Sequence, residues 1–411
     1  MTVIPEATAD PGADAHGVRP EIVLISNDAS ETGAPRSLYT FAHWLAEHEK
    51  AKLRIVLAGG GPLEREFAEL GPVYRTWRGD GSAVERVLRL SRVASWRMHR
   101  KAVLTALANA RRRWNPSLIY ANTITTGHEM EALRCGNTPV VTHVRELASL
   151  FPAIEQTCNL DATLRFSDRF IANSQATKDH LVRRYSVAPA NVDVIHPFID
   201  DTPEALHPPG TAGVRRDLGL DDSVKLVVGC GTLHSRKGTD LFVDVAAAVR
   251  ARRPRDDVHF VWIGGDTTEL KRDDMARLLA ERGLSTFVSF VGHRSDYRRF
   301  LADADLLLLT SREEPFGRVV LEAGLYAKPS ICFADSGGAP EFVRDDAGRV
   351  VPRGDVAAMS TATIELLDSP QMRSSLGACA RERVLRDHRV DTGAPRLWRI
   401  LEHAMKARSE A

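Results

Sequence analysis

Short apolar runs alternate with longer amphipathic segments throughout the first half of the chain. The runs are EIVLIS (21–26), LRIVLA (53–58), SLIYA (117–121), PVVTHV (139–144), DRFIA (168–172) and VDVI (192–195). Nearly continuous runs of this kind are typical of strands buried on both faces, as in a parallel sheet between two helical layers. The pattern therefore predicts an α/β domain with a doubly wound parallel sheet.

A second series of the same kind follows a stretch rich in Pro, Gly and Asp at 196–213. Its runs are VKLVVG (224–229), VHFVWI (258–263), FVSF (287–290), DLLLLT (305–310), PSICF (329–333) and GRVV (348–351). Proline and glycine interrupt regular structure, so we expect a linker between the two series. The sequence thus predicts two Rossmann-like, doubly wound domains that face each other across a deep cleft.

The same pattern sets the expected domain boundaries. Residues 1–18 are rich in Ala, Asp, Gly and Pro without periodicity, which is typical of a disordered leader. The C-terminal segment has apolar residues at helical spacing, and its helix could return to the first domain or pack within the second. After the leader, the predicted parts are an N-terminal domain (19–203), a linker (204–222), a C-terminal domain (223–388) and a C-terminal helix (389–411).

Composition narrows the classes of function. The 55 Lys and Arg residues balance 54 Asp and Glu residues, and the net charge of +1 does not indicate nucleic acid as a partner. Five scattered cysteines without a CxxC pair predict neither a disulfide framework nor a zinc site. The apolar runs are far shorter than the roughly 20 residues that span a bilayer, and no signal peptide is evident. We therefore expect a cytoplasmic protein.

Two strand-to-helix turns carry residues suited to binding anions. In the first turn, Gly33 allows close approach of the backbone, and the free N–H groups of the following helix attract anions. In the second, Arg236 and Lys237 stand between a strand and a helix, where they suit a diphosphate clamp. Taken alone, a tight structural turn and a solvated pair of cations are alternatives that stay open.

The strongest combination of residues follows the run at 305–310. Glu314 falls in the loop after that strand, and Glu322 comes eight residues later, about two helical turns away. Both carboxylates could face one ligand if residues 315–317 form a bend. The alternative is a capping Glu and a surface Glu, but apolar residues flank Glu322, and a buried carboxylate is costly without hydroxyl or cationic partners.

These residues belong to a larger set of motifs. The second half contains K-G at 237–238, E-P-F-G-x-x-x-x-E at 314–322, Ala323 with Pro329, S-G-G-x-x-E at 336–341 and Gly348 with Asp355. This combination resembles the donor-binding domain of the retaining GT-B glycosyltransferases of family 4. The first half agrees with it through Gly33, THVRE (142–146), DRFIANS (168–174) and VIHPFID (194–200), so the resemblance spans about residues 20–390.

The resemblance implies how a nucleoside-diphosphate sugar would be held in the second half. Lys237 and Arg236 would bind the diphosphate. Glu314 and the backbone of Phe316 and Gly317 would bind the donor sugar. The family often has Arg just after the glycine of this turn, where this chain has Thr232, so the clamp depends on Arg236.

Three further roles follow from the same resemblance. Glu322 would accept hydrogen bonds from the nucleotide ribose, Gly33 would lie near the phosphates, and His143 would lie near the reacting sugar. His143 and Glu314 are the candidate catalytic residues, as electrostatic and positioning groups. No protein nucleophile or base is assigned, because in a reaction with retention the leaving diphosphate itself can take the proton of the acceptor.

The expected activity is transfer of a sugar from a nucleoside-diphosphate co-substrate to a hydroxyl of a carbohydrate, lipid-linked or small-molecule acceptor, without a metal or other cofactor. The acidic triplet 303–305 begins a hydrophobic strand and indicates a helix-to-strand junction rather than a metal site. Three alternatives stay open: a sugar-nucleotide epimerase, a phosphorylase, or a non-catalytic binding module of the same fold.

One segment of the first half is strongly basic. Between Arg86 and Arg113 there are nine basic residues and no acidic one. Such a surface could contact an anionic membrane or a phosphorylated lipid. The alternative is a solvated helical face whose acidic partners lie elsewhere in the fold, so peripheral contact with the inner face of a membrane stays an open hypothesis.

Overall fold

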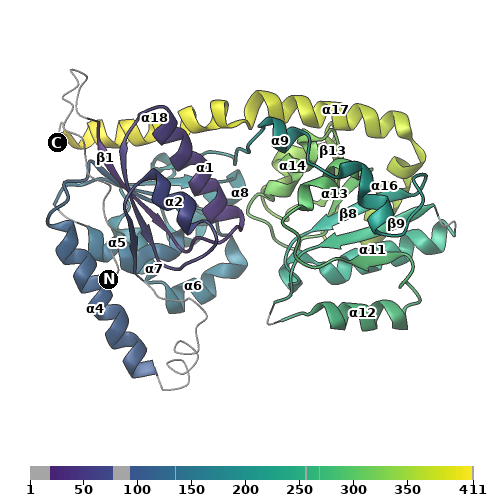
Figure 1. The fold of residues 1–411 in the computed structure, drawn as a ribbon, viewed down its shortest axis with the longest axis horizontal. Helices are drawn as coiled ribbons and strands as arrows, with labels where there is room; N and C mark the ends of the chain where they lie inside the picture. Colours follow the sequence, from purple (N-terminus) through teal and green to yellow (C-terminus); the bar gives the residue numbers. More distant parts are fainter. Residues whose placement is uncertain (1–18, 77–92, 135, 255–256, 268, 410–411) are drawn as a thin grey trace. The chain divides into compact units, whose positions relative to one another are not determined.

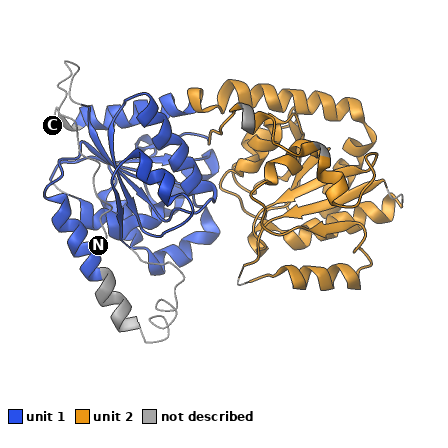
Figure 2. Cartoon of the chain, in the orientation of Figure 1, with its two compact units in different colours: residues 1–196, 393–411 blue, residues 197–392 orange. Residues whose placement is uncertain are grey.

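The computed structural model describes residues 19–76, 93–134, 136–254, 257–267 and 269–409 (Figure 1). The chain divides into two compact units: residues 1–196 together with 393–411 form unit 1, and residues 197–392 form unit 2 (Figure 2). The predicted leader at 1–18 lies outside the described residues.

Unit 1 is built on a parallel sheet in the order β3-β2-β1-β4-β5-β6-β7. The strands are β1 (Glu21–Ser26), β2 (Lys52–Leu57), β3 (Val73–Arg75), β4 (Leu118–Ala121), β5 (Val140–Val144), β6 (Arg169–Ala172) and β7 (Val192–Val194). The helices are α1 (Gly33–Glu47), α2 (Glu64–Leu70), α4 (Val93–Arg111), α5 (Gly127–Leu133), α6 (Phe151–Thr157), α7 (Leu160–Phe166) and α8 (Gln175–Tyr185), with 3-10 turns η1 (Ile124–Thr126), η2 (Ala148–Leu150) and η3 (Pro189–Asn191). The sheet therefore winds in both directions from β1 and β4, as the apolar runs predict.

Unit 2 repeats this plan with the order β10-β9-β8-β11-β12-β13. Its strands are β8 (Lys225–Cys230), β9 (Val258–Ile263), β10 (Val288–Phe290), β11 (Leu306–Leu309), β12 (Ser330–Phe333) and β13 (Gly348–Val351). Its helices are α9 (Pro203–Leu206), α10 (Val214–Asp217), α11 (Thr239–Arg252), α12 (Arg272–Glu281), α13 (Tyr297–Asp303), α14 (Arg318–Leu325), α15 (Ala339–Val343), α16 (Val356–Asp368) and α17 (Pro370–Asp387), with 3-10 turns η4 (Thr211–Gly213) and η5 (Ser235–Lys237).

The core of unit 2 lies on both faces of its sheet. On β8, Val227 packs with Phe242 of α11 in one apolar cluster, whereas Val228 packs with Val320 of α14 in another. Alternate residues of one strand thus enter different helical layers because side chains alternate across the sheet. This two-sided burial explains why the strand sequences are apolar throughout, and it confirms the predicted fold class.

Two features differ from the pattern expected from the sequence. The short strand β3, at the edge of the first sheet, has no predicted counterpart, since three residues are too few to give a pattern. The segment expected to be a linker at 204–222 contains helical turns that belong to unit 2, and Val214 is fully buried there. The chain passes between the units at 196–197 and again at 392–393, within the last helix, α18 (Val390–Ser409).

Candidate functional site

Glu314 lies at the carboxyl edge of the second sheet, in the loop that follows β11. Its backbone N–H donates to the carbonyl of Ser336 at 2.6 Å, and the N–H of Gly338 donates to the Glu314 carbonyl at 3.1 Å. These two hydrogen bonds join the loop after β11 to the loop after β12. The glycine-containing segment at 336–338 therefore fixes the backbone from which the Glu314 side chain projects.

The Glu314 carboxylate is buried and surrounded by donors. The Lys237 ammonium donates to Oε2, and the hydroxyl of Ser311 donates to the same oxygen at 3.4 Å. Arg236 Nη1 lies 4.0 Å from that oxygen and also donates to the carbonyl of Glu313 at 2.9 Å. Burial alone would raise the pKa of Glu314, but Lys237 and Arg236 outweigh it and hold that pKa below its ordinary value. The site therefore holds an ionised carboxylate between two cations.

Two glycines make this close packing possible. Gly238 caps η5 with φ of 65°, and a Cβ there would lie only 2.1 Å from the carbonyl oxygen of Thr310. Gly317 precedes α14 with φ of 81°, and a Cβ there would lie 3.0 Å from Cγ of Glu314. A side chain at either position would strain the backbone. At Gly238 it would also push apart the loops after β8 and β11, whereas at Gly317 it would crowd the Glu314 side chain. The glycines of the two sequence motifs thus bring Lys237 and Glu314 together.

Glu322 is also buried, on the first turns of α14. Its Oε1 accepts a hydrogen bond from the hydroxyl of Tyr297 at 2.8 Å and from Arg318 Nε at 3.5 Å, and Arg298 lies 3.7 Å away. Burial first, and then Glu322, raises the pKa of Tyr297, so that phenol keeps its proton. The predicted cost of burying this carboxylate is therefore offset by one hydroxyl and two guanidinium groups.

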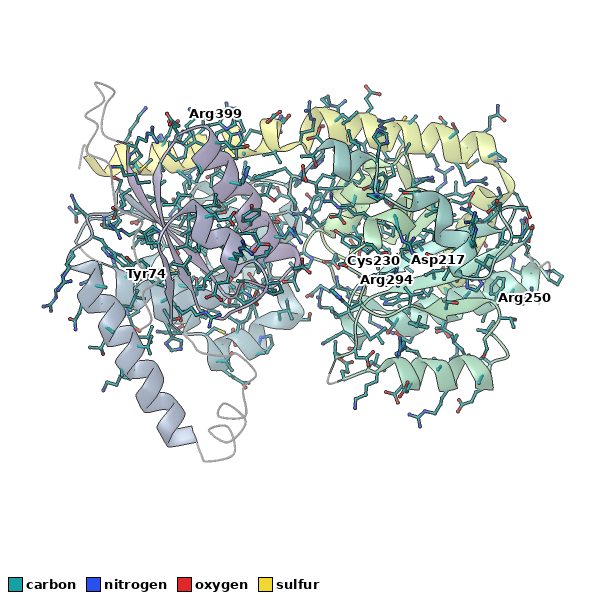
Figure 3. The ribbon with its side chains drawn as sticks, viewed as in Figure 1. Tyr74, Asp217, Cys230, Arg250, Arg294 and Arg399 are labelled. Atoms are coloured by element: carbon teal, nitrogen blue, oxygen red, sulfur yellow. The ribbon has the colours of Figure 1, made fainter. Side chains whose placement is uncertain are left out.

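Cys230 lies within electrostatic range of both Glu314 and Glu322. This residue ends β8 in the middle of unit 2 (Figure 3). Burial first, and then Glu322, raise the pKa of its thiol, Lys237 lowers it and Glu314 raises it, and together these effects bring the pKa to about 12. All three charged groups thus lie within electrostatic reach of one thiol at the end of the central strand.

The side chain of Phe316 packs in the core of unit 2. It is 1% exposed and belongs to the apolar cluster beneath α14, where its ring lies 6.0 Å from that of His388. The backbone of Phe316 and Gly317 continues from Glu314 to the start of α14. Phe316 therefore anchors this loop in the core.

The other two sequence candidates lie in unit 1. Gly33 is the first residue of α1, where Thr32 provides no side-chain cap, and a Cβ at Gly33 would meet no described atom within 4 Å. The turn itself therefore does not require glycine. His143 is buried in β5, and its Nδ1 lies 2.7 Å from the hydroxyl of Tyr120 and 3.3 Å from Arg145 Nη2. Burial and, to a smaller extent, Arg145 hold the pKa of His143 well below its ordinary value.

Sequence reasoning missed the residues that surround these candidates. They are Tyr297, Arg298 and Arg318 around Glu322, and Tyr120, Asn122 and Glu146 around His143 and Arg145. Arg145 and Glu146 are next to each other in the THVRE segment and could have been noticed there. Tyr120 and Arg298 belong to ordinary strand and helix patterns, which carry no signal.

The acidic triplet at 303–305 is the helix-to-strand junction that the sequence indicates, between α13 and β11. Asp303 and Asp305 both form ion pairs with Arg215. Among the residues that the structure describes, no group of three or more His, Cys, Asp or Glu side chains could hold a metal ion.

The basic segment is described only in part. Residues 86–92 lie outside the described residues, and for 93–100 only the helical backbone of α4 is described. Farther along, Lys101, Arg112 and Arg113 are exposed. Within the described chain, no helix is long and apolar enough to cross a membrane.

Solved structures with the same fold define the class of this protein. The chain superimposes on HepE from Anabaena, solved with UDP and glucose, with a TM-score of 0.75 and 20% identity over 94% of this chain and 100% of that one. Sucrose-phosphate synthase from Thermosynechococcus elongatus gives a TM-score of 0.74 and 19% identity over 95% and 100% of the two chains. The two units are thus the paired Rossmann-like domains of the GT-B fold.

Sequence comparisons identify the family. Residues 32–202 match the model described as "Glycosyltransferase Family 4", and residues 224–369 match "Glycosyl transferases group 1". The chain therefore belongs to the group 1, family 4 glycosyltransferases, which confirms the resemblance found in the motifs.

Two relatives illustrate the range of this family. D-inositol 3-phosphate glycosyltransferase of Streptomyces griseus is 29% identical over 66% of this chain and 59% of its own length. A GDP-mannose-dependent phosphatidylinositol monomannoside mannosyltransferase of Corynebacterium glutamicum is 32% identical over 58% and 59%. The matches thus span less than two thirds of the length of these curated relatives.

Proposed function

We propose that this protein is a glycosyltransferase that moves a sugar from a nucleoside-diphosphate donor to a hydroxyl acceptor, with retention and without a metal ion. The observation that carries the proposal is the buried Glu314 carboxylate in contact with Lys237 and beside Arg236, at the carboxyl edge of the second sheet. Ligands of doubly wound sheets bind at that edge. Family membership supports the same function.

The charges of the site suit a diphosphate. Four cationic side chains surround two carboxylates, an excess of positive charge that the two phosphates of a donor would balance; they are Arg236 and Lys237 near Glu314, and Arg298 and Arg318 near Glu322. In the proposed complex, Lys237 exchanges Glu314 for a phosphate oxygen. Glu314 then accepts hydrogen bonds from hydroxyls of the donor sugar.

Glu322 is proposed to bind the ribose. Its described hydrogen bonds all reach Oε1, and the second oxygen would accept from a ribose hydroxyl. Tyr297 and the two arginines would orient this carboxylate before the nucleotide binds. The site would therefore be preorganised for the nucleoside, which reduces the entropy cost of binding.

In the proposed reaction, the bond from the sugar C1 to the diphosphate oxygen breaks and a bond from C1 to the acceptor oxygen forms on the same face. The departing diphosphate takes the proton of the acceptor hydroxyl. Lys237 and Arg236 would stabilise the negative charge that develops on the leaving group, the main electrostatic contribution in such a site. No metal ion is needed for this step.

We infer a hexose donor carried on UDP or GDP. The fold neighbour from Anabaena was solved with UDP and glucose, and one relative is named for its dependence on GDP-mannose. The acceptor would be a carbohydrate, lipid-linked or small-molecule hydroxyl. If it is lipid-linked, the basic segment at 86–113 would contact the membrane surface.

The test is a thermal-shift panel of UDP-, GDP-, ADP- and dTDP-sugars in EDTA, followed by assays of nucleoside diphosphate release with candidate acceptors. A ligand at 100 times its Kd stabilises by about 2.7 kcal/mol, enough for a shift of several degrees. Glu322→Gln should abolish the shift, whereas Glu281→Gln, on the exposed end of α12, should not. A shift that requires a divalent metal, or no shift with any donor, would overturn the proposal.

The stereochemistry needs a separate measurement. The product anomer, followed by NMR from the start of the reaction, should keep the configuration of the donor. Release of nucleoside diphosphate with phosphate as the acceptor would favour a phosphorylase, and conversion of the nucleotide sugar without an acceptor would favour an epimerase.

A further inference from the structure

Glu146 is a buried carboxylate in unit 1 that the proposed donor site in unit 2 does not use. It follows β5 by two residues, at the carboxyl edge of the first sheet, and is 8% exposed. The neighbouring strand is β4, which is followed by the turn η1. Ligands of doubly wound sheets bind at this edge, near the point where the strand order reverses, which here lies between β1 and β4. Glu146 therefore lies where a ligand of unit 1 would bind.

Two backbone N–H groups fix the orientation of this carboxylate. Its Oε2 accepts from the N–H of Arg145 at 2.9 Å and from the N–H of Ile124, the first residue of η1, at 3.3 Å. These hydrogen bonds join the loop after β5 to the loop after β4. Both of the described hydrogen bonds of the side chain reach the same oxygen. The lone pairs of the second oxygen, Oε1, are therefore available to a donor from a ligand.

No cation forms an ion pair with Glu146 among the residues that the structure describes. The charge that acts on its pKa is that of Arg145, whose Nε donates to the carbonyl and side-chain oxygens of Asn122 at 3.2 and 3.0 Å. Burial outweighs this charge and the backbone N–H groups, and it raises the pKa of Glu146 to about 7. A buried carboxyl group without a cation in contact is costly for the fold, and such groups are concentrated at functional sites.

A structural role alone would not require an acid at this position. The side-chain oxygen of a glutamine could accept from the same two backbone N–H groups, with no charge to bury. The carboxylate differs from that amide in its second oxygen, which accepts hydrogen bonds where the amide has an NH₂ donor. The residue type therefore points to a ligand that donates a hydrogen bond to Oε1.

The neighbouring turn supplies uncharged hydroxyl groups. Thr123 and Thr125 flank Ile124, and their hydroxyl oxygens lie 2.6 Å apart. Thr125 is half-buried. A threonine hydroxyl can both donate and accept, as can the hydroxyls of a sugar. A carboxylate beside such a turn suits a polyol, whereas a phosphate would meet a like charge with no cation in contact with that carboxylate.

We propose that Oε1 of Glu146 accepts a hydrogen bond from a hydroxyl of a neutral polyol, such as a sugar ring, that binds at the carboxyl edge of the sheet in unit 1. That this polyol is the acceptor of sugar transfer rests on the proposed function, whereas the contact itself does not. The proposal narrows the class of acceptor, because the part that meets Glu146 carries hydroxyls and no phosphate.

The direct test is ¹³C NMR of the glutamate carboxyl carbons in the full-length protein, with Glu146 assigned by comparison with Glu146→Gln. The pH titration of this resonance is recorded for the protein alone and with D-mannose, myo-inositol or inorganic phosphate. A hydroxyl that donates to the ionised carboxylate favours that form, so a neutral polyol should lower the pKa of Glu146. No response to either polyol, or a rise of this pKa when phosphate binds, would overturn the proposal.

Glu146→Gln tests the contact during transfer, with Glu69→Gln, at an exposed position of α2, as the matched control. The variant can keep both hydrogen bonds to the backbone, but it presents an NH₂ group in place of Oε1. The KM of the hydroxyl acceptor should rise about tenfold, while the Kd of the nucleotide sugar and the spectrum of the folded protein stay unchanged. Glu69→Gln should alter none of these. An unchanged acceptor KM in Glu146→Gln would refute the contact.

The two measurements separate this proposal from the proposed function. If a nucleotide sugar binds and the Glu146 resonance responds to neither polyol, the donor site stands and the contact is wrong. If the resonance responds to a polyol in a protein that binds no nucleotide sugar, the contact stands and the proposed transfer is wrong.

Discussion

The strand β11 has a pair of carboxylates associated with each of its ends. Asp303 and Asp305 stand at its amino end, and Glu314 follows its carboxyl end, with Glu322 on the next helix. Both pairs are surrounded by arginine and lysine. Nevertheless, the first pair holds the fold together, whereas the second forms the candidate binding site.

The difference lies in the partners of each pair. Asp305 accepts from the backbone N–H of Leu226 at 2.9 Å and forms ion pairs with Arg215 and Arg373 at 3.1 and 3.4 Å. Arg215 in turn donates to two backbone carbonyls. Because backbone groups take part on both sides, this network cannot open without separating strands and helices.

The carboxyl end is built from side chains on glycine-containing loops. Lys237 contacts the Glu314 side chain, and the backbone bends at Gly238 and Gly317 to allow it. A cation whose partner is one side chain can exchange that partner for a ligand phosphate. Two carboxylates therefore form a structural network at one end of β11 and a candidate binding site at the other.

The largest expected effect is a loss of stability of unit 2 when the network at the amino end of β11 is broken. Asp305→Asn should lower the free energy of unfolding of unit 2 by about 3–5 kcal/mol, because buried cations lose their counter-ion. Denaturant titration of the variant measures this loss. Glu281→Gln is the control and should stay within about 0.5 kcal/mol of the parent protein. An Asp305→Asn variant as stable as the parent would contradict the structural role of the network.

The largest effect on activity is expected from a substitution at the carboxyl end of β11. Lys237→Met should reduce kcat by about 10²–10³-fold, because the variant lacks the preorganised positive charge that stabilises the leaving diphosphate. Lys225→Met removes the cation 3.7 Å from Asp305 and serves as the control, with kcat expected near that of the parent. Steady-state kinetics with the donor identified by thermal shift measure both. Similar losses in the two variants would remove the proposed distinction between the ends.

Unit 1 also contains a buried carboxylate, Glu146, and its hydrogen-bond donors are backbone N–H groups. Burial raises the pKa of Glu146 from 4.5 to about 7, so the folded state binds a proton that the unfolded state has lost between those values. The stability of unit 1 should therefore fall as pH rises from 4.5 to 7, by up to about 3 kcal/mol. Thermal unfolding across this range should show the decline, and Glu146→Gln should flatten it. A slope unchanged in Glu146→Gln would assign the pH dependence to other groups.

The smallest effect concerns the exchange of partners by Lys237. Glu314→Gln removes the carboxylate that competes with a phosphate for this ammonium, so the variant should bind UDP or GDP alone up to about tenfold more tightly, a gain of roughly 1.4 kcal/mol. Calorimetry of the parent and the variant measures the two Kd values, with Glu281→Gln as the control. Weaker binding of the bare nucleotide by Glu314→Gln would mean that the carboxylate orients Lys237 instead of competing for it.

Much of the fold could be predicted because its strands are buried on both faces. Each such strand is a continuous apolar run, and β1 coincides with the predicted run at 21–26. The three-residue strand β3 and the helical turns at 204–222 escaped prediction. They are too short to show a period, and their stability comes from contacts with distant segments, such as that of Arg215 with Asp305.

The sequence by itself determined the two parallel sheets, the glycine turns and the motif residues Lys237, Glu314 and Glu322, because local spacing and residue type carry that information. Only the tertiary structure decided which groups meet each carboxylate and which side chains surround His143. Tyr120 lies 23 residues before His143, and Lys237 lies 77 residues before Glu314. Such contacts are created when parallel strands bring the ends of distant segments to one edge of a sheet, and no local pattern records them.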